Sequence, residues 1–364
     1  MEKITFQMHR GFHEVLKARV NEYFATRAIR PRDNWQMYLK TALIATWVLM
    51  SYISLVFLAS SWYVALPLVL SFAFAICAVG FNIQHDGAHQ AFSNSKNVNW
   101  LMAFTMDLIG GSHVFWRRKH NILHHTYTNI NGVDEDIFDG SMFRLSPDQS
   151  RKKIHRFQHF YTYALYAFLT LKWMFYDDWK SLFRVRFGKA DEQPRISNRD
   201  VILFVATKAF HASYSLIIPA LFHPIWLVIL FNLLFHFVLG FMLAVVFQMA
   251  HAVGDVAFPT PDKTTGDIDN EWAIHQVETT ANFAMNNPII GWYAGGLNFQ
   301  IEHHLFPRIC HIHYRPLSAI VQKTCAEFGV HYQSYSTFLK GFVAHFRWLR
   351  TMGKAYPFPE TATS

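Results

Sequence analysis

The chain has 364 residues, of which 52% are hydrophobic and only 16% are charged, and it contains 35 Phe and 11 Trp. This composition is too apolar and too aromatic for most soluble enzymes, and it predicts an integral membrane protein. The net charge of +8 comes without a compact basic motif, so no nucleic-acid partner is expected, and the three cysteines lack the spacing of a disulfide framework or a thiolate site.

The first forty residues are polar and of mixed charge, without a recognisable secretory signal. From Thr41 to Gln84 there is no Asp, Glu, Lys or Arg, and this run is about twice the roughly 20 residues that one membrane-spanning helix needs. A second run, from Val201 to Gly254, has Lys208 as its only such charge. Ser60-Ser61-Trp62 and His223-Pro224 mark turns within the two runs. We therefore expect four spans in two hairpins, at about residues 41–59, 63–84, 201–221 and 225–250.

Charge asymmetry predicts the orientation of these spans. Neither hairpin turn carries Lys or Arg, whereas the flanks, the middle segment and the tail are rich in both, so the polar segments are expected on the cytoplasmic side. The predicted fold is an all-α integral membrane protein, a single domain over residues 1–364, with a cytoplasmic helical cap formed by residues 85–200 and 251–364. Trp100–Trp116 and Phe157–Trp173 are interpreted as interfacial or cap helices. A fifth span at Tyr161–Phe175 is the less favoured alternative.

Three groups of histidines flank the predicted spans. Imidazoles packed this densely in a weakly charged, apolar protein are costly to bury unless something binds them. On a helix, His120 and His124 would lie one turn apart on one face, and His125 would project roughly 100° further round, so the three could serve two adjacent metal ions. The three groups are His85-Asp86-Gly87-Ala88-His89, His120-Asn121-Ile122-Leu123-His124-His125 and Gln300-Ile301-Glu302-His303-His304.

The number of histidines indicates more than one metal ion. A single zinc site needs three or four ligands, whereas these groups hold seven histidines. Imidazole suits iron, zinc and copper, so ligand type alone does not choose the metal, but a two-metal site beside apolar helices favours oxygen chemistry on a lipid chain. His251 closes the fourth span and is a further candidate ligand, whereas His236 lies in mid-span and is interpreted as a packing residue. The alternative from another class is a metal or haem transport or sensing protein, whose histidines would line the spans.

The ordered boxes resemble the membrane-bound fatty-acid desaturases, and within them the front-end group, whose third box begins with Gln. Similarity to bacterial acyl-CoA or linoleoyl-CoA-type members extends from roughly Phe81 to His331. The resemblance implies a di-iron centre that uses O2 to remove two hydrogens from neighbouring methylenes of an acyl chain and so forms a cis double bond. The flanking segments that also carry it are His125-Thr126-Tyr127-Thr128-Asn129, Asp134-Glu135-Asp136 and Gly295-Gly296-Leu297-Asn298-Phe299.

The resemblance also implies roles for single residues. Asp86 and Glu302 are expected to hold imidazole N–H groups. Gln300 is expected to leave one iron with a more open or water-filled position, because an amide oxygen is a poorer donor to a metal than imidazole. The implied ligands of the two iron ions are His85, His89, His120, His124, His125, His251, His303 and His304.

The 364 residues contain no His-Pro-Gly-Gly haem motif, so, unlike many eukaryotic front-end members, the protein is expected to have no fused cytochrome b5 domain. Electrons are therefore expected from a separate donor, either ferredoxin or cytochrome b5 with its reductase. The substrate is expected to be an acyl-CoA or a membrane lipid. Hydroxylation, acetylenic-bond formation and decarboxylation stay open as alternatives on the same scaffold, since the outcome depends on how the acyl chain is placed.

Two further charged segments have open interpretations. The clusters Arg117-Arg118-Lys119 and Arg151-Lys152-Lys153 could contact coenzyme A phosphates or an acidic electron donor, or they could reflect the positive-inside rule alone. Asp134-Glu135-Asp136 lacks the twelve-residue ligand pattern of a calcium loop. We expect it to support the metal site or the folding of the cap.

Overall fold

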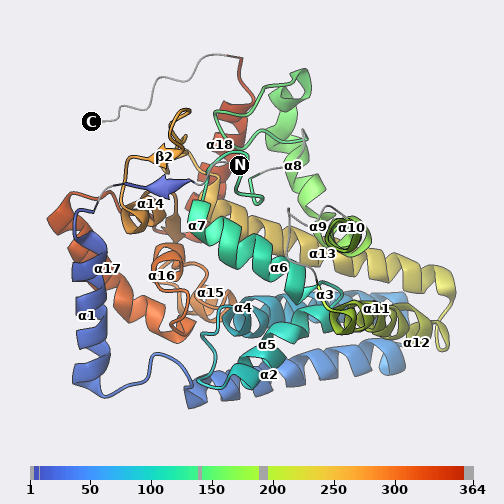
Figure 1. Ribbon diagram of the computed structural model, residues 1–364. Coiled ribbons are helices and arrows are strands. Elements are labelled where there is room, and N and C mark those ends of the chain that lie inside the picture. The colour runs from blue at the N-terminus through green and yellow to red at the C-terminus, as the bar shows by residue number, and fades with distance from the viewer. Residues whose placement is uncertain (1–3, 8, 138–141, 188–195, 356–364) are drawn as a thin grey trace. The chain divides into compact units, whose positions relative to one another are not determined.

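The computed structural model describes residues 4–7, 9–137, 142–187 and 196–355, and these are mostly helical (Figure 1). The chain divides into two compact units. Each unit is built from separate segments of the chain, and the helices Gln158–Tyr166 and Ile225–His251 each cross from one unit to the other. Unit 1 comprises Met1–Pro31, Arg118–Tyr163 and Val245–Ser364, and unit 2 comprises Arg32–Arg117 and Ala164–Ala244.

Within the described part of the chain, four helices are long and apolar enough to cross a membrane, as the two uncharged runs predicted. The first begins before the predicted residue 41, because Lys40 lies inside the helix and is buried. The second continues through His85, so the first histidine box forms the last turn of this helix rather than a segment after it. The four candidate spans are Trp35–Leu58, Trp62–Ala88, Asn198–Ala220 and Ile225–His251.

Three of the four candidate spans contain a π-helical turn, in which hydrogen bonds run from residue i to i+5. Such turns are frequent at functional sites. One of them directly precedes His85. The elements of the spans are α2 (Trp35–Ile53), η1 (Ser54–Leu58), α3 (Trp62–Val79), η2 (Gly80–Gln84), α4 (His85–Ala88), α11 (Asn198–Ala212), η6 (Ser213–Ile217), α12 (Ile218–Ala220) and α13 (Ile225–His251).

Side-chain hydrogen bonds join the spans within unit 2. Trp47 of α2 donates from Nε1 to Ser71 Oγ of α3 over 2.9 Å, and the Tyr52 hydroxyl donates to the backbone oxygen of Tyr214 over 2.8 Å. In hydrocarbon no water can satisfy these groups, so each polar side chain on a span needs a partner inside the protein. These two bonds link side chains or backbone of three of the four helices.

Shorter helices complete unit 2. Gly87 lets α4 approach the helix that follows, because a Cβ atom at this position would lie 2.5 Å from Met102 Cβ. The segment 100–116, interpreted from the sequence as interfacial, forms two helices, and the region of the alternative fifth span at 161–175 is broken into short pieces. Among the described residues, this region is not one of the candidate spans. The further elements are α5 (Lys96–Leu108), α6 (His113–Arg117), α9 (Leu169–Lys172), η5 (Trp173–Asp177) and α10 (Asp178–Phe187).

The core of unit 1 forms around the N-terminal helix α1 (Phe12–Arg27), which lies beside α17 (Tyr314–Phe328) (Figure 1). Phe12, Leu16 and Val20 recur at helical spacing and are buried against residues of α17 and of the third histidine box. Glu271 accepts hydrogen bonds from the backbone N–H groups at the start of α1, including that of His13 at 2.7 Å. An acidic side chain at this position also suits the positive end of the helix dipole.

Two small parallel sheets also belong to unit 1, whereas the sequence predicted an all-α fold. Their strands have only two or three residues, too few to produce a period-two pattern of hydrophobicity. Asn282 of one strand accepts from the backbone N–H of Ile301 over 2.9 Å, so the sheet helps to hold the third histidine box. The pairs are β1 (Thr5–Phe6) with β2 (Asp267–Ile268) and β3 (Ala281–Phe283) with β4 (Gln333–Tyr335).

The C-terminal helix α18 (Phe338–Met352) packs on the segment that follows the fourth candidate span. His345 donates from Nδ1 to the backbone oxygen of Ala252 over 2.7 Å, one residue after His251. This contact fixes the end of α13 within unit 1. The remaining elements are η3 (Arg118–His124), α7 (His125–Tyr127), η4 (Lys153–Phe157), α8 (Gln158–Tyr166), α14 (Trp272–Glu278), α15 (Pro288–Tyr293), α16 (Gln300–Leu305) and η7 (His311–His313).

Candidate metal centre

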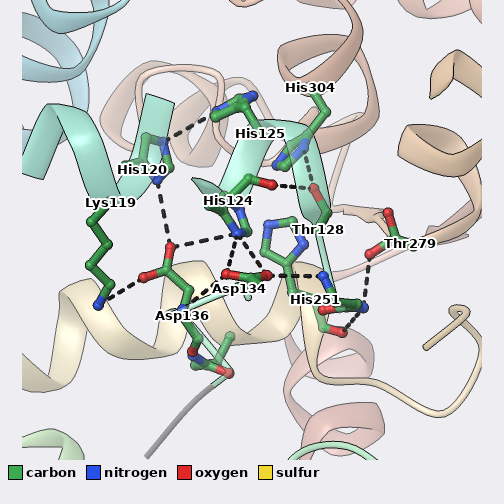
Figure 2. A network of polar contacts seen from close by, with 12 residues as sticks. Lys119, His120, His124, His125, Thr128, Asp134, Asp136, His251, Thr279 and His304 are labelled. Carbon is green, nitrogen blue, oxygen red and sulfur yellow. Dashed lines mark hydrogen bonds and ion pairs between the residues drawn. The ribbon is translucent and has the colours of Figure 1, made fainter. Parts of the chain in front are cut away.

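Three histidines from three separate segments of unit 1 converge. His124 ends η3, His251 ends α13 and His304 lies in α16, and one ligand nitrogen from each lies within 4.8 Å of the other two. Their ring centroids are 4.6 to 4.9 Å apart, and all three side chains are buried. Figure 2 shows His251 close to His124 and His304. His251, the candidate ligand at the end of α13, thus lies beside histidines of the second and third boxes.

The second histidine box is not an ordinary α-helix. Arg118–His124 forms a π-helical turn, so residues five apart, rather than four apart, come into line. His120 and His125 have their Nε2 atoms 3.3 Å apart, while His120 and His124 stack with ring centroids 5.2 Å apart. The expected projection of His125 away from His120 was therefore wrong, because it assumed α-helical geometry. The π-helical turn brings all three imidazoles of the box together.

The remaining histidine of the third box joins this group. His303 lies with its ring centroid 4.6 Å from that of His125 and 6.1 Å from that of His120. His125 in turn stacks on His304 at 4.3 Å. Unit 1 therefore gathers six of the eight expected ligands in one buried cluster, which we call the histidine cluster: His120, His124, His125, His251, His303 and His304.

Polar partners orient the imidazoles of the histidine cluster. His124 Nδ1 lies 3.1 Å from Asp134 Oδ2, and an ionised carboxylate can only accept, so Nδ1 carries the proton and Nε2 is the nitrogen available to a metal. Gln276 Oε1 holds His304 Nδ1 in the same way at 2.8 Å. His303 Nδ1 lies 3.2 Å from the Tyr314 hydroxyl. Such partners fix the tautomer and ring direction of metal-ligating histidines.

Charge around the second box favours a bound cation. Burial lowers the pKa of His120 to about 4, with partial opposition from Asp136, so this imidazole is neutral at neutral pH and able to bind a metal. Burial also lowers the pKa of His124, but the carboxylates of Asp134 and Asp136 outweigh it and the net shift is upward. Asp136 also pairs with Lys119 at 3.0 Å (Figure 2). The carboxylates that stabilise a positive His124 would equally stabilise a metal cation in its place.

Gln300, the first residue of the third box, lies beside the histidine cluster. Its amide nitrogen lies 3.4 Å from His251 Nε2, and its side chain is buried. Because amide nitrogen and oxygen are assigned from their surroundings, either atom of the amide can face this imidazole. Gln300 is thus in contact with one of the three converging histidines.

Glu302 has different partners from those expected. Its two carboxylate oxygens accept hydrogen bonds from Asn282 Nδ2 and from the Tyr332 hydroxyl, each over 2.7 Å, and neither partner is an imidazole. Burial raises the pKa of this carboxyl to about 7 against the opposing effect of both bonds. Because β3 and the segment before β4 supply these partners, Glu302 ties the third box to the small sheet.

The first histidine box lies in unit 2. His85 and His89 are one helical turn apart with ring centroids 4.7 Å apart, and both are buried. Asp86 lies between them on α4 and is 2% exposed. The one-turn pair that the spacing predicted is therefore present within this unit.

The sequence analysis assigned no role to three residues that support the histidine cluster. Asn129 has a positive φ of 60°, which Asn tolerates better than most residues, and its amide donates to the backbone oxygens of His251, Ala257 and Thr279 over 3.0, 3.1 and 3.2 Å. Thr128 lies beside Gln276 at 3.0 Å. Asn129 and Thr128 follow the second box directly, and that proximity was a usable signal. No such signal exists for Gln276 in the sequence, because this residue lies 28 positions from His304, the histidine it holds.

The arrangement fits a metal centre on its own geometry. Buried nitrogen donors converge from separate segments, their opposite nitrogens are held by a carboxylate, an amide and a hydroxyl, and carboxylates compensate positive charge. Imidazole-rich sites of this kind suit iron, zinc or copper more than magnesium or calcium. The residues present therefore fit an iron cofactor.

Comparison with known proteins identifies the family. A family model described as fatty acid desaturase matches residues 60–336. The chain is 40% identical over 355 residues to the sn-1 linoleoyl-lipid 6-desaturase of Synechocystis sp. (strain ATCC 27184 / PCC 6803 / Kazusa), covering 97% of this chain and 99% of that protein. It is 41% identical over 352 residues to the protein of the same name from Arthrospira platensis, covering 96% and 95%.

A longer relative is also similar. Identity to the acyl-lipid (8-3)-desaturase of Physcomitrium patens is 37% over 346 residues, covering 94% of this chain and 72% of that protein. These matches confirm the resemblance that the histidine boxes indicated, and they agree with the four apolar helices and the histidine cluster. The chain belongs to the fatty acid desaturase family, a family of membrane-associated oxidoreductases that act on fatty acyl substrates.

Proposed function

We propose that the protein introduces a cis double bond into the acyl chain of a membrane lipid, with a linoleoyl-lipid as substrate and carbon 6 as the position of reaction. The observation that carries this proposal is the near full-length similarity to two sn-1 linoleoyl-lipid 6-desaturases. Because each alignment covers 95% or more of the relative, the similarity includes the apolar helices as well as the histidine boxes. An acyl-lipid is therefore preferred over an acyl-CoA as substrate.

The proposed cofactor is a pair of iron ions. When bound, iron supplies the O2-dependent redox chemistry that side chains cannot perform. Asp134 and Gln276 support this proposal because they hold the Nδ1 atoms of His124 and His304, which directs the opposite nitrogens inward. Asp86, Glu302 and Gln300 are proposed to position the ligands. The proposed ligands are His85, His89, His120, His124, His125, His251, His303 and His304.

Gln300 is proposed to tune the centre rather than to retain its metal. Its amide faces His251 at 3.4 Å, and an amide can hydrogen-bond a water as donor or acceptor but is a weak metal ligand. The chain itself must also exclude bulk water and hold the acyl chain still, because the position of the new double bond depends on that placement.

We further infer that the four apolar helices cross the membrane as two hairpins and that residues 1–364 form one desaturase domain. The scarcity of Lys and Arg in the turns near residues 60 and 223 supports a cytoplasmic location for the histidine boxes. Electrons are proposed to come from a separate ferredoxin, or from cytochrome b5 with its reductase. Turnover by the purified chain would then depend on the added donor.

The experiment is lipid analysis after expression in a host that makes linoleoyl lipids and supplies reductant. Fatty acids released from the sn-1 position are analysed by gas chromatography and mass spectrometry with derivatives that locate double bonds. We expect a new trienoic acid with a double bond at carbon 6, and none with His304→Ala as the matched control. A hydroxylated product would refute desaturation and support the hydroxylase alternative. A double bond at another carbon would refute the proposed position.

A further inference from the structure

A cavity of about 240 Å³ lies within unit 2, away from the histidine boxes. All four candidate spans contribute to its wall, each near the end where residues 59–62 or 221–225 join two helices. Its lining contains no Asp, Glu, Lys or Arg. The volume exceeds the roughly 150 Å³ of an apolar cavity that can bind benzene and is below the roughly 300 Å³ of the smallest drug-sized sites. It therefore has room for part of a chain-like molecule, and not for a whole lipid.

Most polar atoms of the lining are already engaged by the protein. The Tyr52 hydroxyl donates to the backbone oxygen of Tyr214 over 2.8 Å. His223 donates from Nε2 to the backbone oxygen of Val56 over 2.7 Å, and Asn232 donates to Ser215 O over 3.3 Å. An occupant thus needs no hydrogen-bonding groups inside the cavity, which points to hydrocarbon rather than to a polar ligand.

The inner end of the cavity, toward His85, is closed. Phe72 of α3 and Phe235 of α13 stack with ring centroids 5.1 Å apart, and both line the cavity. Beyond them the same two helices are tightly packed, since Cys77 Sγ lies 3.9 Å from the backbone oxygen of Leu239. Thirteen residues separate Phe72 from His85, which corresponds to about 20 Å along a helix. An occupant therefore enters from the opposite end of the helices.

That opposite end has the character of a membrane interface. Ser60 and Trp62 line the cavity and are exposed, whereas Val69 and Val228, deeper in the wall, are 2% and 6% exposed. Trp is enriched where apolar side chains meet lipid headgroups. The Ser61 hydroxyl is buried at this end and has no hydrogen-bond partner among the described residues, so it can donate to an ester carbonyl.

We propose that this cavity binds one acyl chain of a membrane glycerolipid, with the headgroup at the interface near Trp62 and the chain end against Phe72 and Phe235. The occupant is a bound lipid of the leaflet on the side of the helix-joining turns, and it is not the substrate held at the histidines. This inference concerns the spans alone and does not rest on the proposed substrate or reaction.

The test is photolabelling of the full-length protein in nanodiscs that contain phosphatidylcholine with a diazirine near the end of one acyl chain. After illumination, labelled peptides are mapped by mass spectrometry. We expect labels on Val69, Phe72 and Phe235, saturating at about one lipid per chain and competed by unlabelled phosphatidylcholine. Ala65→Trp, which fills the cavity, should reduce these labels at least fivefold.

Two controls keep the proposal falsifiable. Leu66→Trp places the same indole side chain at the neighbouring, exposed position of α3, which does not line the cavity, and should leave the labels unchanged. Ala65→Leu fills less space and serves if Ala65→Trp fails to fold. Labels confined to exposed residues such as Leu66, labelling that does not saturate, equal labelling in all variants, or labelling by a diazirine fatty acid but not by the lipid would each overturn the proposal.

Discussion

Buried histidines occur in both units, and their surroundings differ. In unit 1, His124, His251 and His304 converge, and a carboxylate and an amide hold the Nδ1 atoms of two of them. In unit 2, His211 and His236 are equally buried, but their ring centroids are 5.8 Å apart, and the side-chain partner of His236 is the hydroxyl of Thr170. Burial alone therefore does not distinguish a metal ligand from a packing residue. The convergence of the three imidazoles in unit 1, and the acceptors behind two of them, distinguish the metal-site histidines from the packing residues.

One helix contains an example of each kind, which makes the comparison directly testable. His236 and His251 both lie on α13, fifteen residues apart. Variants at these two positions share the same helix, the same original residue and nearly complete burial. The predictions below run from the largest expected effect on bound iron to the smallest.

The largest effect is expected for His251→Leu. This change removes one of the three converging imidazoles, and leucine offers no ligand atom in its place. We expect the purified protein to lose at least one iron per chain and all detectable desaturation, measured by inductively coupled plasma mass spectrometry and product analysis. Full iron content in this variant would remove His251 from the proposed ligand set.

A smaller loss is expected for Asp134→Asn. The amide can still accept from His124 Nδ1, but it lacks the charge that Asp134 supplies, and loss of such partners typically weakens metal binding about 10- to 100-fold. Asp134 also accepts backbone N–H bonds from Asn129 and Asp136, each over 2.9 Å. The measurement is iron retained against increasing chelator concentration. Asp148→Asn, at an exposed residue of the same unit, is the control and should match the unmodified protein.

Asn129→Gly should affect iron moderately. Glycine keeps the positive φ of 60° but leaves the backbone oxygens of His251 and Thr279 without the amide donor. We expect faster iron loss to a chelator and a stability loss of about 1–3 kcal/mol. Asn129→Ala should be worse by about 1–2 kcal/mol, because alanine is also strained at this φ. If Gly were neutral and only Ala were harmful, Asn129 would serve backbone conformation alone.

Gln300→Ala separates metal binding from activity. The side chain contacts His251 but is a poor ligand, so most iron should remain while most desaturation is lost. Gln300→Ile should behave in the same way, and Gln300→His should keep part of the activity if imidazole is an adequate substitute. His303→Ala is the contrast, since it should lose iron. Unchanged rate and product in Gln300→Ala would show that the residue only fills space.

The smallest effect is expected for His236→Leu. Thr170 keeps a hydrogen bond to the backbone oxygen of residue 236 at 3.1 Å, so loss of the imidazole leaves no unsatisfied hydroxyl. We expect unchanged iron content and activity, with a stability change within about 1.5 kcal/mol. Loss of iron from this variant comparable to that in His251→Leu would erase the distinction between these two histidines.

The sequence predicted these elements unevenly, for physical reasons. The four apolar helices were clear because a membrane span needs a long uncharged run, and the boxes were clear because ligands on one helix recur at fixed spacing. Lys40 and the first histidine box were expected outside the spans, but both lie within span helices. A charged residue or the start of a motif does not by itself end a helix. The π-helical turn at His120 was missed because its pattern over a few residues does not differ from that of an α-helix.

Contacts between distant segments were beyond sequence reasoning. The bond from Gln276 to His304 and the bonds from Asn282 and Tyr332 to Glu302 join residues 20 to 30 positions apart without any periodic signal. Asp134 was expected to support the site or the cap, and it holds His124. The short strands that supply Asn282 have too few residues to show alternation.

The most direct test of the central claim, an iron centre built on the histidine cluster, is the metal content of active protein purified from cells grown in 57Fe, measured by mass spectrometry and by Mössbauer spectroscopy. The account predicts two iron atoms per chain in nitrogen-rich sites, with loss of the signal in His251→Leu and its retention in His236→Leu. An active sample that holds one zinc ion and no iron would contradict it.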